Sequence, residues 1–304
     1  PVAITVLVKN PDSSITGEIH FHDIGDYLDR KQKLGIIRDF GALSGITSSD
    51  GWTAIESDKH NDWLNQRDTT FDAFIRIGEK KDKSAEKIFD NFTQGILTSR
   101  DFWCYNSSRK ALSENISRMI DFYNSEIERI EELGLLKEAK DHVFREDSKV
   151  NWSRALLNSA SKGRKLGFTE SHVVLATYRP FSKQWMYYDR SLNEMMYQNE
   201  QVFPKGVAEN RIIAVPGNGG SKGFSAYMLE TLYDFNAMEA GAQCFPLLLY
   251  ENQAANEEDS LFSYDKSDIG ATRDGITDTG LRHFQAFYPG EEITKEDLFY
   301  YVYG

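Results

Sequence analysis

The chain has 304 residues, of which 40% are hydrophobic and 13% aromatic, and its formal net charge is −12. This apolar content is enough to bury a core, so wholesale disorder is excluded, and the length allows one large domain or two smaller ones. No apolar run approaches the ~18 residues of a membrane span, and the first residues lack the basic region and the cleavage site of a signal peptide, so we expect no membrane partner. The two cysteines, Cys104 and Cys244, cannot form a disulfide framework, and a reducing cytoplasm is the expected compartment.

The first residues predict a buried strand. Residues 2–8 form a continuous run rich in β-branched side chains, which is typical of a strand covered on both faces in an α/β sheet. A single strand has no sheet to join, so we interpret this segment as a leading strand left over from a larger domain. A short strand (19–22), a polar helix (28–40) and a loop rich in glycine and serine (41–62) are expected to follow.

The next segment predicts a helical layer. Ser84 can cap a helix that runs to about Leu97, and Ser107 or Ser108 begins the clearest helix of the chain. Ser148 is expected to cap a further helix that ends at Gly163. The central helix has apolar residues at every third or fourth position, which define one buried face: Leu112, Ile116, Met119, Ile120, Tyr123, Ile127 and Ile130.

Beyond residue 165 the pattern changes to short β-rich runs. Turn signals at Arg179-Pro180 and in the glycine-rich stretch 216–220 separate strands expected at 173–178, 185–188, 211–215, 224–228 and 245–250. Residues 251–274 are polar and acidic and predict a mobile surface loop. Two short helices, near 277–288 and 294–303, end the chain. The order predicts an α+β fold in which a helical layer is followed by a β-rich segment.

Charge is unevenly distributed along the chain. Residues 149–222 hold 11 basic and 5 acidic residues, a net charge of +6, whereas residues 251–304 hold 12 acidic and 4 basic residues, a net charge of −8. The overall acidity argues against a simple nucleic-acid coat protein. The basic middle could nevertheless hold phosphates, and the alternative is an ordinary solvated surface.

Familiar catalytic motifs are missing. The sequence has no Gly-x-x-x-x-Gly-Lys-Ser/Thr phosphate loop, no Gly-x-Gly-x-x-Gly and no Gly-x-Ser-x-Gly nucleophile elbow, and Asn10-Pro11-Asp12 departs from the Asn-Pro-Pro-Tyr pattern of amino-methyltransferases. His20 and His22 share one face of a predicted strand, where a surface or structural role explains them better than a metal site. We therefore expect no catalytic and no metal-binding residues.

Two aromatic-rich segments carry a resemblance to a known family. The first is residues 99–106, Ser-Arg-Asp-Phe-Trp-Cys-Tyr-Asn, with 62–67 upstream of it, and the second is residues 178–190, which begin Tyr-Arg-Pro-Phe. Together with the C-terminal stretch 276–304 they resemble the C-terminal region of single-chain, Type I-like (Type ISP) restriction-modification enzymes, many of which are labelled predicted helicases. The resemblance covers nearly the whole chain.

The resemblance implies a domain organisation. In that family one polypeptide carries a nuclease, an ATP-driven motor, an N6-adenine methyltransferase and a target-recognition domain. Residues 1–40 would then be the end of the methyltransferase domain and a connector, and residues 41–304 the target-recognition domain. This domain would comprise a helical part at about 84–165, a β-rich part at about 168–250 and C-terminal helices at about 276–303.

The resemblance also implies partners and cofactors. The chain would bind double-stranded DNA and contact the methyltransferase and motor domains of its parent. S-adenosylmethionine, ATP and Mg would act elsewhere in the parent, and this chain would be no enzyme by itself. Two alternatives stay open: a protein-interaction or scaffolding domain without direct DNA contact, and an enzyme with an unrecognised active site.

Candidate DNA contacts are residue types that hold phosphates or read base edges. Each has a structural alternative: a solvated helix end for Arg164 and Lys165, an ion pair with Asp189 for Arg179, an ordinary turn for Asn218, and a buried polar network for Arg100. The full set of predicted contacts is Arg100, Asn106, Arg164, Lys165, Arg179, Lys183, Gln184, Arg190, Asn218 and Lys222.

Overall fold

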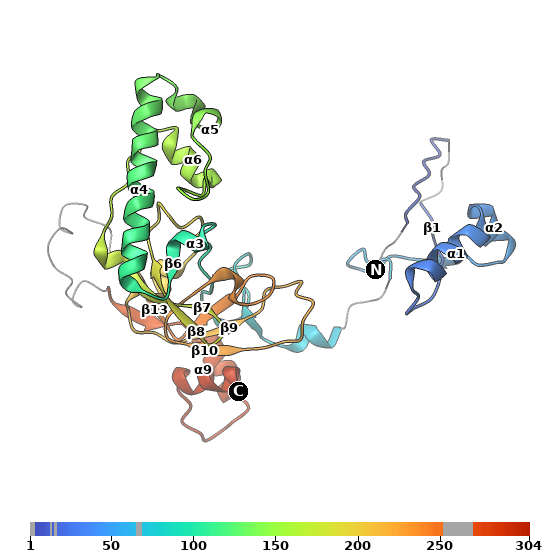
Figure 1. Ribbon diagram of the computed structural model, residues 1–304. Helices are drawn as coiled ribbons and strands as arrows, with labels where there is room; N and C mark the ends of the chain where they lie inside the picture. Colours follow the sequence, from blue (N-terminus) through green and yellow to red (C-terminus); the bar gives the residue numbers. More distant parts are fainter. Residues whose placement is uncertain (1–3, 13, 15–16, 65–68, 252–269) are drawn as a thin grey trace. The chain divides into compact units, whose positions relative to one another are not determined.

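The computed structural model describes residues 4–12, 14, 17–64, 69–251 and 270–304, and it divides into two compact units, residues 1–74 and residues 75–304 (Figure 1). The boundary predicted at residue 40 lies inside the first unit. The assignment of residues 1–40 to a methyltransferase domain and a connector stays a prediction. None of the helices in the described ranges is long and apolar enough to cross a membrane.

In its described part, the first unit contains an antiparallel pair of short strands and two α-helices. The strands are β1 (Ile19–Phe21) and β2 (Thr53–Ile55), and the helices are α1 (Arg30–Phe40) and α2 (Leu43–Ser48), followed by a 3-10 turn, η1 (Thr69–Ala73). Asp29 and Gln32 form a capping box that begins α1. The helix predicted at 28–40 is confirmed, whereas the segment predicted as a loop at 41–62 contains α2 and β2.

The strand predicted at residues 2–8 is not formed in the described residues 4–8. Ile4, Leu7 and Val8 are 76, 85 and 88% exposed. A strand needs a neighbour that pairs with its backbone N–H and C=O groups, and no described segment pairs with this one. The predicted strand would belong to the sheet of a methyltransferase domain, and no described segment supplies that sheet, so the leading strand stays a prediction.

Two four-stranded sheets organise the described part of the second unit. One has the order β11–β7–β8–β6 and consists of β11 (Leu232–Tyr233), β7 (Val173–Arg179), β8 (Ser182–Tyr187) and β6 (Tyr105–Asn106). The other has the order β10–β9–β12–β5 and consists of β10 (Tyr227–Leu229), β9 (Ile212–Val215), β12 (Gln243–Pro246) and β5 (Thr93–Gln94). Two smaller pairs accompany them, β3 (Arg76–Gly78) with β4 (Lys87–Phe89) and β13 (Leu248–Tyr250) with β14 (Thr272–Asp274).

The long helix α4 (Arg109–Glu132) begins against the β7–β8 sheet and extends away from it beside α5 (Ala139–His142) and α6 (Arg154–Ala160) (Figure 1). Ser108 caps it, because its side-chain oxygen accepts a hydrogen bond from the backbone N–H of Ala111. All seven apolar residues predicted to form its buried face are buried. They pack with Val173 and Tyr187 of the sheet and with the short helices α5 and α6.

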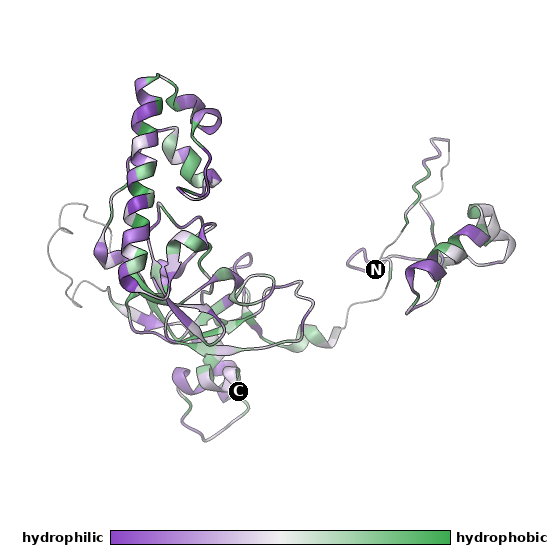
Figure 2. Ribbon diagram, viewed as in Figure 1, coloured by the Kyte–Doolittle hydropathy of each residue, from purple (hydrophilic) through white to green (hydrophobic). Residues whose placement is uncertain are grey.

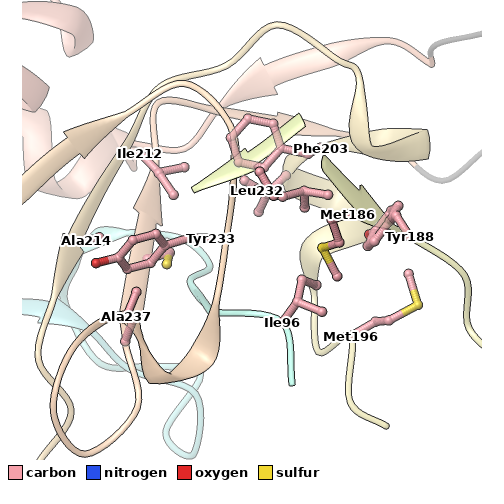
Figure 3. Packing of buried hydrophobic residues seen from close by; sticks show 14 of the residues in the cluster. Ile96, Met186, Tyr188, Met196, Phe203, Ile212, Ala214, Leu232, Tyr233 and Ala237 are labelled. Atoms are coloured by element: carbon pink, nitrogen blue, oxygen red, sulfur yellow. The ribbon is translucent and has the colours of Figure 1, made fainter. Parts of the chain in front are cut away.

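The two sheets pack against each other through a second core. Side chains alternate between the faces of a strand, so Val173 of β7 packs on the α4 side while Val174 and Ala176 face the second sheet. Figure 3 shows this core, in which Met186 and Leu232 of the first sheet lie near Ile212 and Ala214 of the second. The segment from α7 (Asn199–Val202) to Phe203 closes one end of it.

A third cluster fixes the C-terminal helices to the other side of the second sheet. Phe89 and Phe245 pack with Leu298 and Phe299 of α9 (Lys295–Tyr303), and α8 (Asp278–Gln285) lies beside them. The second unit thus stacks a helical layer, two sheets and a pair of short helices, with hydrophobic residues concentrated on the inner faces (Figure 2). The α+β class and the two C-terminal helices are confirmed.

Three local predictions need correction. Residues 84–97 form β4 and β5 rather than a helix, because their backbone groups pair with β3 and β12, which the local pattern does not contain. Helix α6 begins after Ser153, whose side chain caps it, and not after Ser148. Most of the loop predicted at 251–274, residues 252–269, lies outside the described residues, and 272–274 form β14.

Candidate nucleic-acid interface

Arg179 ends β7 and takes part in an ion-pair network. Its Nη1 atom lies 2.7 Å from Asp234 Oδ1 and its Nη2 atom lies 3.5 Å from Asp101 Oδ2. The guanidinium also lies over the ring of Tyr178, 3.9 Å from the ring centre. The Arg179 side chain, 37% exposed, is therefore held by two carboxylates, an arrangement that favours a structural role.

Asp189 was the expected structural partner of Arg179, and this expectation is wrong. The Oδ2 atom of Asp189 lies 2.8 Å from His172 Nδ1. Asp189 follows β8, whereas the partners of Arg179 come from α3 (Asp101–Cys104) and from the residue after β11. The order of strands in the sheet brings those segments together, because β11 pairs in parallel with β7.

Asp234 is the fully buried acid of this network, and its pKa is raised. Its side chain is 0% exposed. Burial, together with the nearby charge of Asp101, raises the pKa of Asp234 to about 6, although Arg179 and a hydrogen bond from the backbone N–H of Asn236 act in the opposite direction. The carboxyl therefore takes up a proton in a mildly acidic solution.

Asn106 and Gln184 meet in one cleft, which we call the amide cleft. Asn106 lies in β6 and Gln184 in β8, and these strands are hydrogen-bonded neighbours. Asn115, from the second turn of α4, adds a third amide. The cleft has a volume of about 310 Å³ and is lined by Asp101, Phe102, Tyr105, Asn106, Ser107, Asn115, Tyr178 and Gln184.

The amide cleft offers donors and acceptors between aromatic walls. Phe102 is 80% exposed. The Oδ1 atom of Asn106 accepts a hydrogen bond from the backbone N–H of Ser108 over 2.9 Å, which orients that side chain. The amide of Gln184 makes no hydrogen bond to any described residue, so its donor and acceptor are available to a ligand. A side-chain amide can donate one hydrogen bond and accept another. It can therefore pair with the edge of a base through two hydrogen bonds, as it does with another amide.

A second cleft, of about 490 Å³, lies on the other side of Asp101 and Phe102 and includes Arg100 in its lining. Arg100 is only 3% exposed. Its guanidinium donates hydrogen bonds to the backbone O of Leu192, to Ser153 Oγ and to the backbone O of Asn151. The structure shows the buried polar network that is the alternative for this residue. It corrects the prediction of a DNA contact, because each of the three guanidinium nitrogens of Arg100 has an acceptor inside the fold.

Arg164 and Lys165 lie apart from the amide cleft, after α6 and beside α4. Both are exposed. Lys165 Nζ lies 2.9 Å from Glu128 Oε1, and the backbone O of Arg164 accepts a hydrogen bond from Tyr123 Oη. The side chain of Arg164 has no ion-pair partner in the described ranges. The two residues therefore differ in their availability to a phosphate: Lys165 is already paired with Glu128, whereas the side chain of Arg164 is not paired with any described residue.

The exposed cations of the hairpin region differ from Arg179. Lys183, on β8, and Arg190, in the turn that follows it, are exposed and have no ion-pair partner among the residues that the structure describes. Such side chains can contact phosphates without first breaking an internal interaction.

Asn218 and Lys222 lie in the glycine-rich loop 216–223, and both are exposed. The loop is fixed by Glu239, whose Oε2 accepts a hydrogen bond from the backbone N–H of Lys222 over 2.7 Å and whose Oε1 accepts one from Ser221 Oγ over 2.7 Å. These hydrogen bonds lower the pKa of Glu239 to about 2. Gly217 is required for close approach, since a Cβ atom there would lie 2.0 Å from the backbone O of Ala240.

Sequence reasoning missed Asn115 and Phe102 as parts of the site. Phe102 lies in the aromatic segment 99–106, which carries the family resemblance, so the sequence contained a local signal that could have identified it. Asn115 lies on the polar face of α4 and has no local signal. In the described ranges, no group of three or more His, Cys, Asp or Glu side chains is arranged to hold a metal ion.

The family model for the Type ISP C-terminal specificity domain matches residues 87–304. All ten predicted contacts lie in this range. The chain therefore belongs to the family of Type ISP specificity domains, and the resemblance inferred from its aromatic segments is confirmed. No curated protein sequence matches the chain.

Similar solved structures agree with this assignment. The ATP-dependent Type ISP restriction-modification enzyme LlaBIII bound to DNA is 28% identical, with a TM-score of 0.72 over 96% of this chain and 17% of that one. A nuclease-deletion mutant of the Type ISP enzyme LlaGI in complex with a DNA substrate mimic is 33% identical, with a TM-score of 0.68 over 88% of this chain and 23% of that one. The DrdV–DNA complex is 28% identical, with a TM-score of 0.72 over 94% of this chain and 26% of that one. The chain thus spans about a quarter or less of each of these proteins.

Proposed function

We propose that this chain recognises a specific sequence in double-stranded DNA within a Type ISP restriction-modification enzyme. In this role it positions an N6-adenine methyltransferase and an ATP-driven nuclease carried elsewhere in the enzyme. Family membership and the DNA-bound state of the similar structures support the class of function. The observation that carries the proposal is the convergence of Asn106, Gln184 and Asn115 on the amide cleft.

Recognition divides between two kinds of residue. The amide cleft holds side chains suited to base edges on strands that are fixed by pairing, which is the arrangement needed to discriminate one base from another. The exposed cations Lys183, Arg190 and Arg164, which have no ion-pair partner among the described residues, and the exposed Lys222 supply attraction to the phosphate backbone. An overall charge of −12 is compatible with this role, because binding depends on the local field.

The test is the site preference of single variants. Gln184→Ala and Asn106→Ala, made in the intact enzyme that contains this chain, should each relax the preference at one position of the site, at a cost of about 1–3 kcal/mol. The readout is methylation of a library of randomised sites. Gln198→Ala is a matched control, because Gln198 is exposed and does not line the cleft. If both cleft variants keep the preference of the parent at every position, the amide cleft does not read DNA.

We further infer that the chain has no methyltransferase, ATPase or nuclease activity of its own. S-adenosylmethionine, ATP and Mg would bind other domains of the enzyme, since the motifs that hold them are missing from this sequence. Methyl transfer by the purified chain would overturn this inference. A cytoplasmic location is proposed with it, and it is supported by two cysteines that are buried as free thiols.

A second candidate function is a protein contact, either as a scaffold or with the methyltransferase and motor domains of the parent. The observation in its favour is a group of exposed aromatic residues at the C-terminal helices, in which Phe287 is 71% and Tyr301 is 60% exposed. A gel shift on random duplexes at increasing salt distinguishes the two functions. A DNA-recognition domain shifts the duplex in a salt-dependent way, and a pure protein-interaction domain does not.

A further inference from the structure

The turn between β7 and β8 presents an aromatic ring to solvent. Pro180 and Phe181 form this turn between the paired residues Arg179 and Ser182. Phe181 is 89% exposed. Its ring contact within the described residues is an edge contact with Tyr227, with the ring centres 5.1 Å apart and the planes at 81°. Burial therefore does not explain why a phenylalanine stands here.

The backbone of Phe181 adopts a conformation that favours glycine. Its φ angle is +63°, in the left-handed region that bulky residues rarely adopt. Proline at the first position of a two-residue turn and a positive φ at the second are the pattern of a type II turn, whose second position prefers Gly or Asn. Phe181 strains the backbone and gains little burial, and residues held in such strain cluster at functional sites.

The rest of the hairpin holds this ring in a fixed position. The ladder between β7 and β8 extends from the pair Val173–Tyr187 to the pair Arg179–Ser182 at the turn, with one shift of register between Thr177 and Arg179. Arg179 is itself fixed by its ion pairs with Asp234 and Asp101. Lys183, two residues after Phe181, is exposed and has no ion-pair partner in the described ranges. The tip thus combines a rigid apolar ring with a nearby cation.

We propose that Phe181 is a wedge that inserts between adjacent base pairs of the bound duplex and kinks it, while Lys183 contacts a phosphate beside the opened step. The inference rests on the proposed DNA recognition. Apolar side chains inserted in this way unstack a base step, and the bend lets the duplex contact more protein surface. Because an exposed ring leaves water when it stacks on bases, insertion also supplies the burial that Phe181 lacks in the free protein.

The experiment uses the intact enzyme with Phe181→Gly and Phe181→Asn. Both residues tolerate a positive φ, so the hairpin should fold at least as well as with phenylalanine. Duplexes with the recognition site carry dyes at both ends to report bending, and 2-aminopurine at successive positions to report unstacking. Measurements are made at saturating protein concentration. Phe181→Trp keeps a ring at the tip, and Phe144→Ala removes another exposed ring, from the segment between α5 and α6.

We expect the parent protein to shorten the end-to-end distance and to raise 2-aminopurine fluorescence at one step. The Gly and Asn variants should lose both signals, bind about tenfold more weakly and keep the parent's Tm, whereas Phe181→Trp and Phe144→Ala should behave like the parent. The wedge is overturned if the bend and the fluorescence are unchanged in the Gly and Asn variants. It is also overturned if the Tm falls in both variants, because the ring is then structural. A parent protein that binds duplexes without bending them also overturns it, but leaves DNA recognition intact. Failure of the parent to bind any duplex refutes the proposed function instead.

Discussion

At the scale of single residues, burial separates the cations that stabilise the fold from those available to a ligand. Arg100 and Arg190 are both arginines, and the sequence predicts both as DNA contacts. Arg100 is 3% exposed, with acceptors from three residues around it, whereas Arg190 is exposed and has no ion-pair partner in the described ranges. The environment, and not the residue type, decides which of them can contact DNA.

Arg100→Ala should therefore lower the free energy of unfolding, by about 2–3 kcal/mol, because it leaves buried acceptors without their charged donor. Arg190→Ala, a matched arginine variant at the surface, should change it by less than about 0.5 kcal/mol. Urea denaturation of both variants measures the difference. A stable Arg100→Ala protein with weakened DNA binding would show that Arg100 contacts the ligand after all.

Asp234 predicts a pH dependence of stability. Its pKa is raised to about 6 in the folded protein by burial, against an ordinary value of 3.8, so the folded state binds more protons between these values. The free energy of unfolding should therefore fall as the pH rises through this window, by up to about 3 kcal/mol from this group. Asp234→Asn cannot ionise and should show a smaller fall. Urea unfolding of both proteins from about pH 4 to about pH 7 tests this, and equal slopes would contradict it.

At the scale of elements, the glycine-rich loop shows how one carboxylate can fix a surface segment. Glu239 accepts hydrogen bonds from Ser221 and Lys222 across the loop, and Gly217 lies close against Ala240. The loop presents Asn218 and Lys222 from a defined backbone rather than from a flexible tip. This is the condition under which a loop residue can contribute to specificity.

Glu239→Ala should accelerate hydrogen exchange at the amide of Lys222, since that N–H then has no acceptor. In the unmodified protein the protection should persist into acid, because the lowered pKa of Glu239, about 2, keeps the carboxylate ionised until the pH approaches that value. Glu230→Ala, which removes an exposed partner of Arg211, is the control. Protection that is unchanged in Glu239→Ala would mean that the backbone alone fixes the loop.

At the scale of the molecule, the predicted DNA-binding residues come from different elements of the second unit. Those that line the amide cleft come from β6 and β8, those in the glycine-rich loop are fixed by Glu239, and Arg164 and Lys165 lie on the helical layer. Base reading and phosphate binding are therefore assigned to different side chains of the second unit. This separation makes their contributions experimentally distinguishable.

Replacing Lys183, Arg190 and Lys222 together with alanine should weaken binding to all duplexes alike. The slope of log K against log salt should become shallower by about 0.9 for each phosphate that the variant no longer neutralises. Lys165→Ala should have a smaller effect, because Lys165 is already paired with Glu128. The measurement is binding at several salt concentrations on specific and random duplexes. A slope that does not change in the triple variant assigns these cations to the solvated surface.

Local patterns were sufficient for the features that depend on neighbouring residues. The helical periodicity of residues 112–130 identified the apolar buried face of α4, and β-rich runs identified most strands of both large sheets, because these signals repeat within one element. The aromatic segments at 99–106 and 178–190 identified the family for a similar reason, since each is a short contiguous motif.

Other features depended on partners far away in the chain. Residues 84–97 carry a helical cap signal but form strands with β3 and β12, and residues 4–8 have the pattern of a strand but lack a described neighbour. The ion pair of Arg179 with Asp234 and the meeting of Asn106 with Gln184 likewise depend on the strand order of one sheet. Pairing and burial are set by interactions between segments that are far apart in sequence, so only the tertiary structure could decide which polar residues stabilise the fold and which remain available to a ligand.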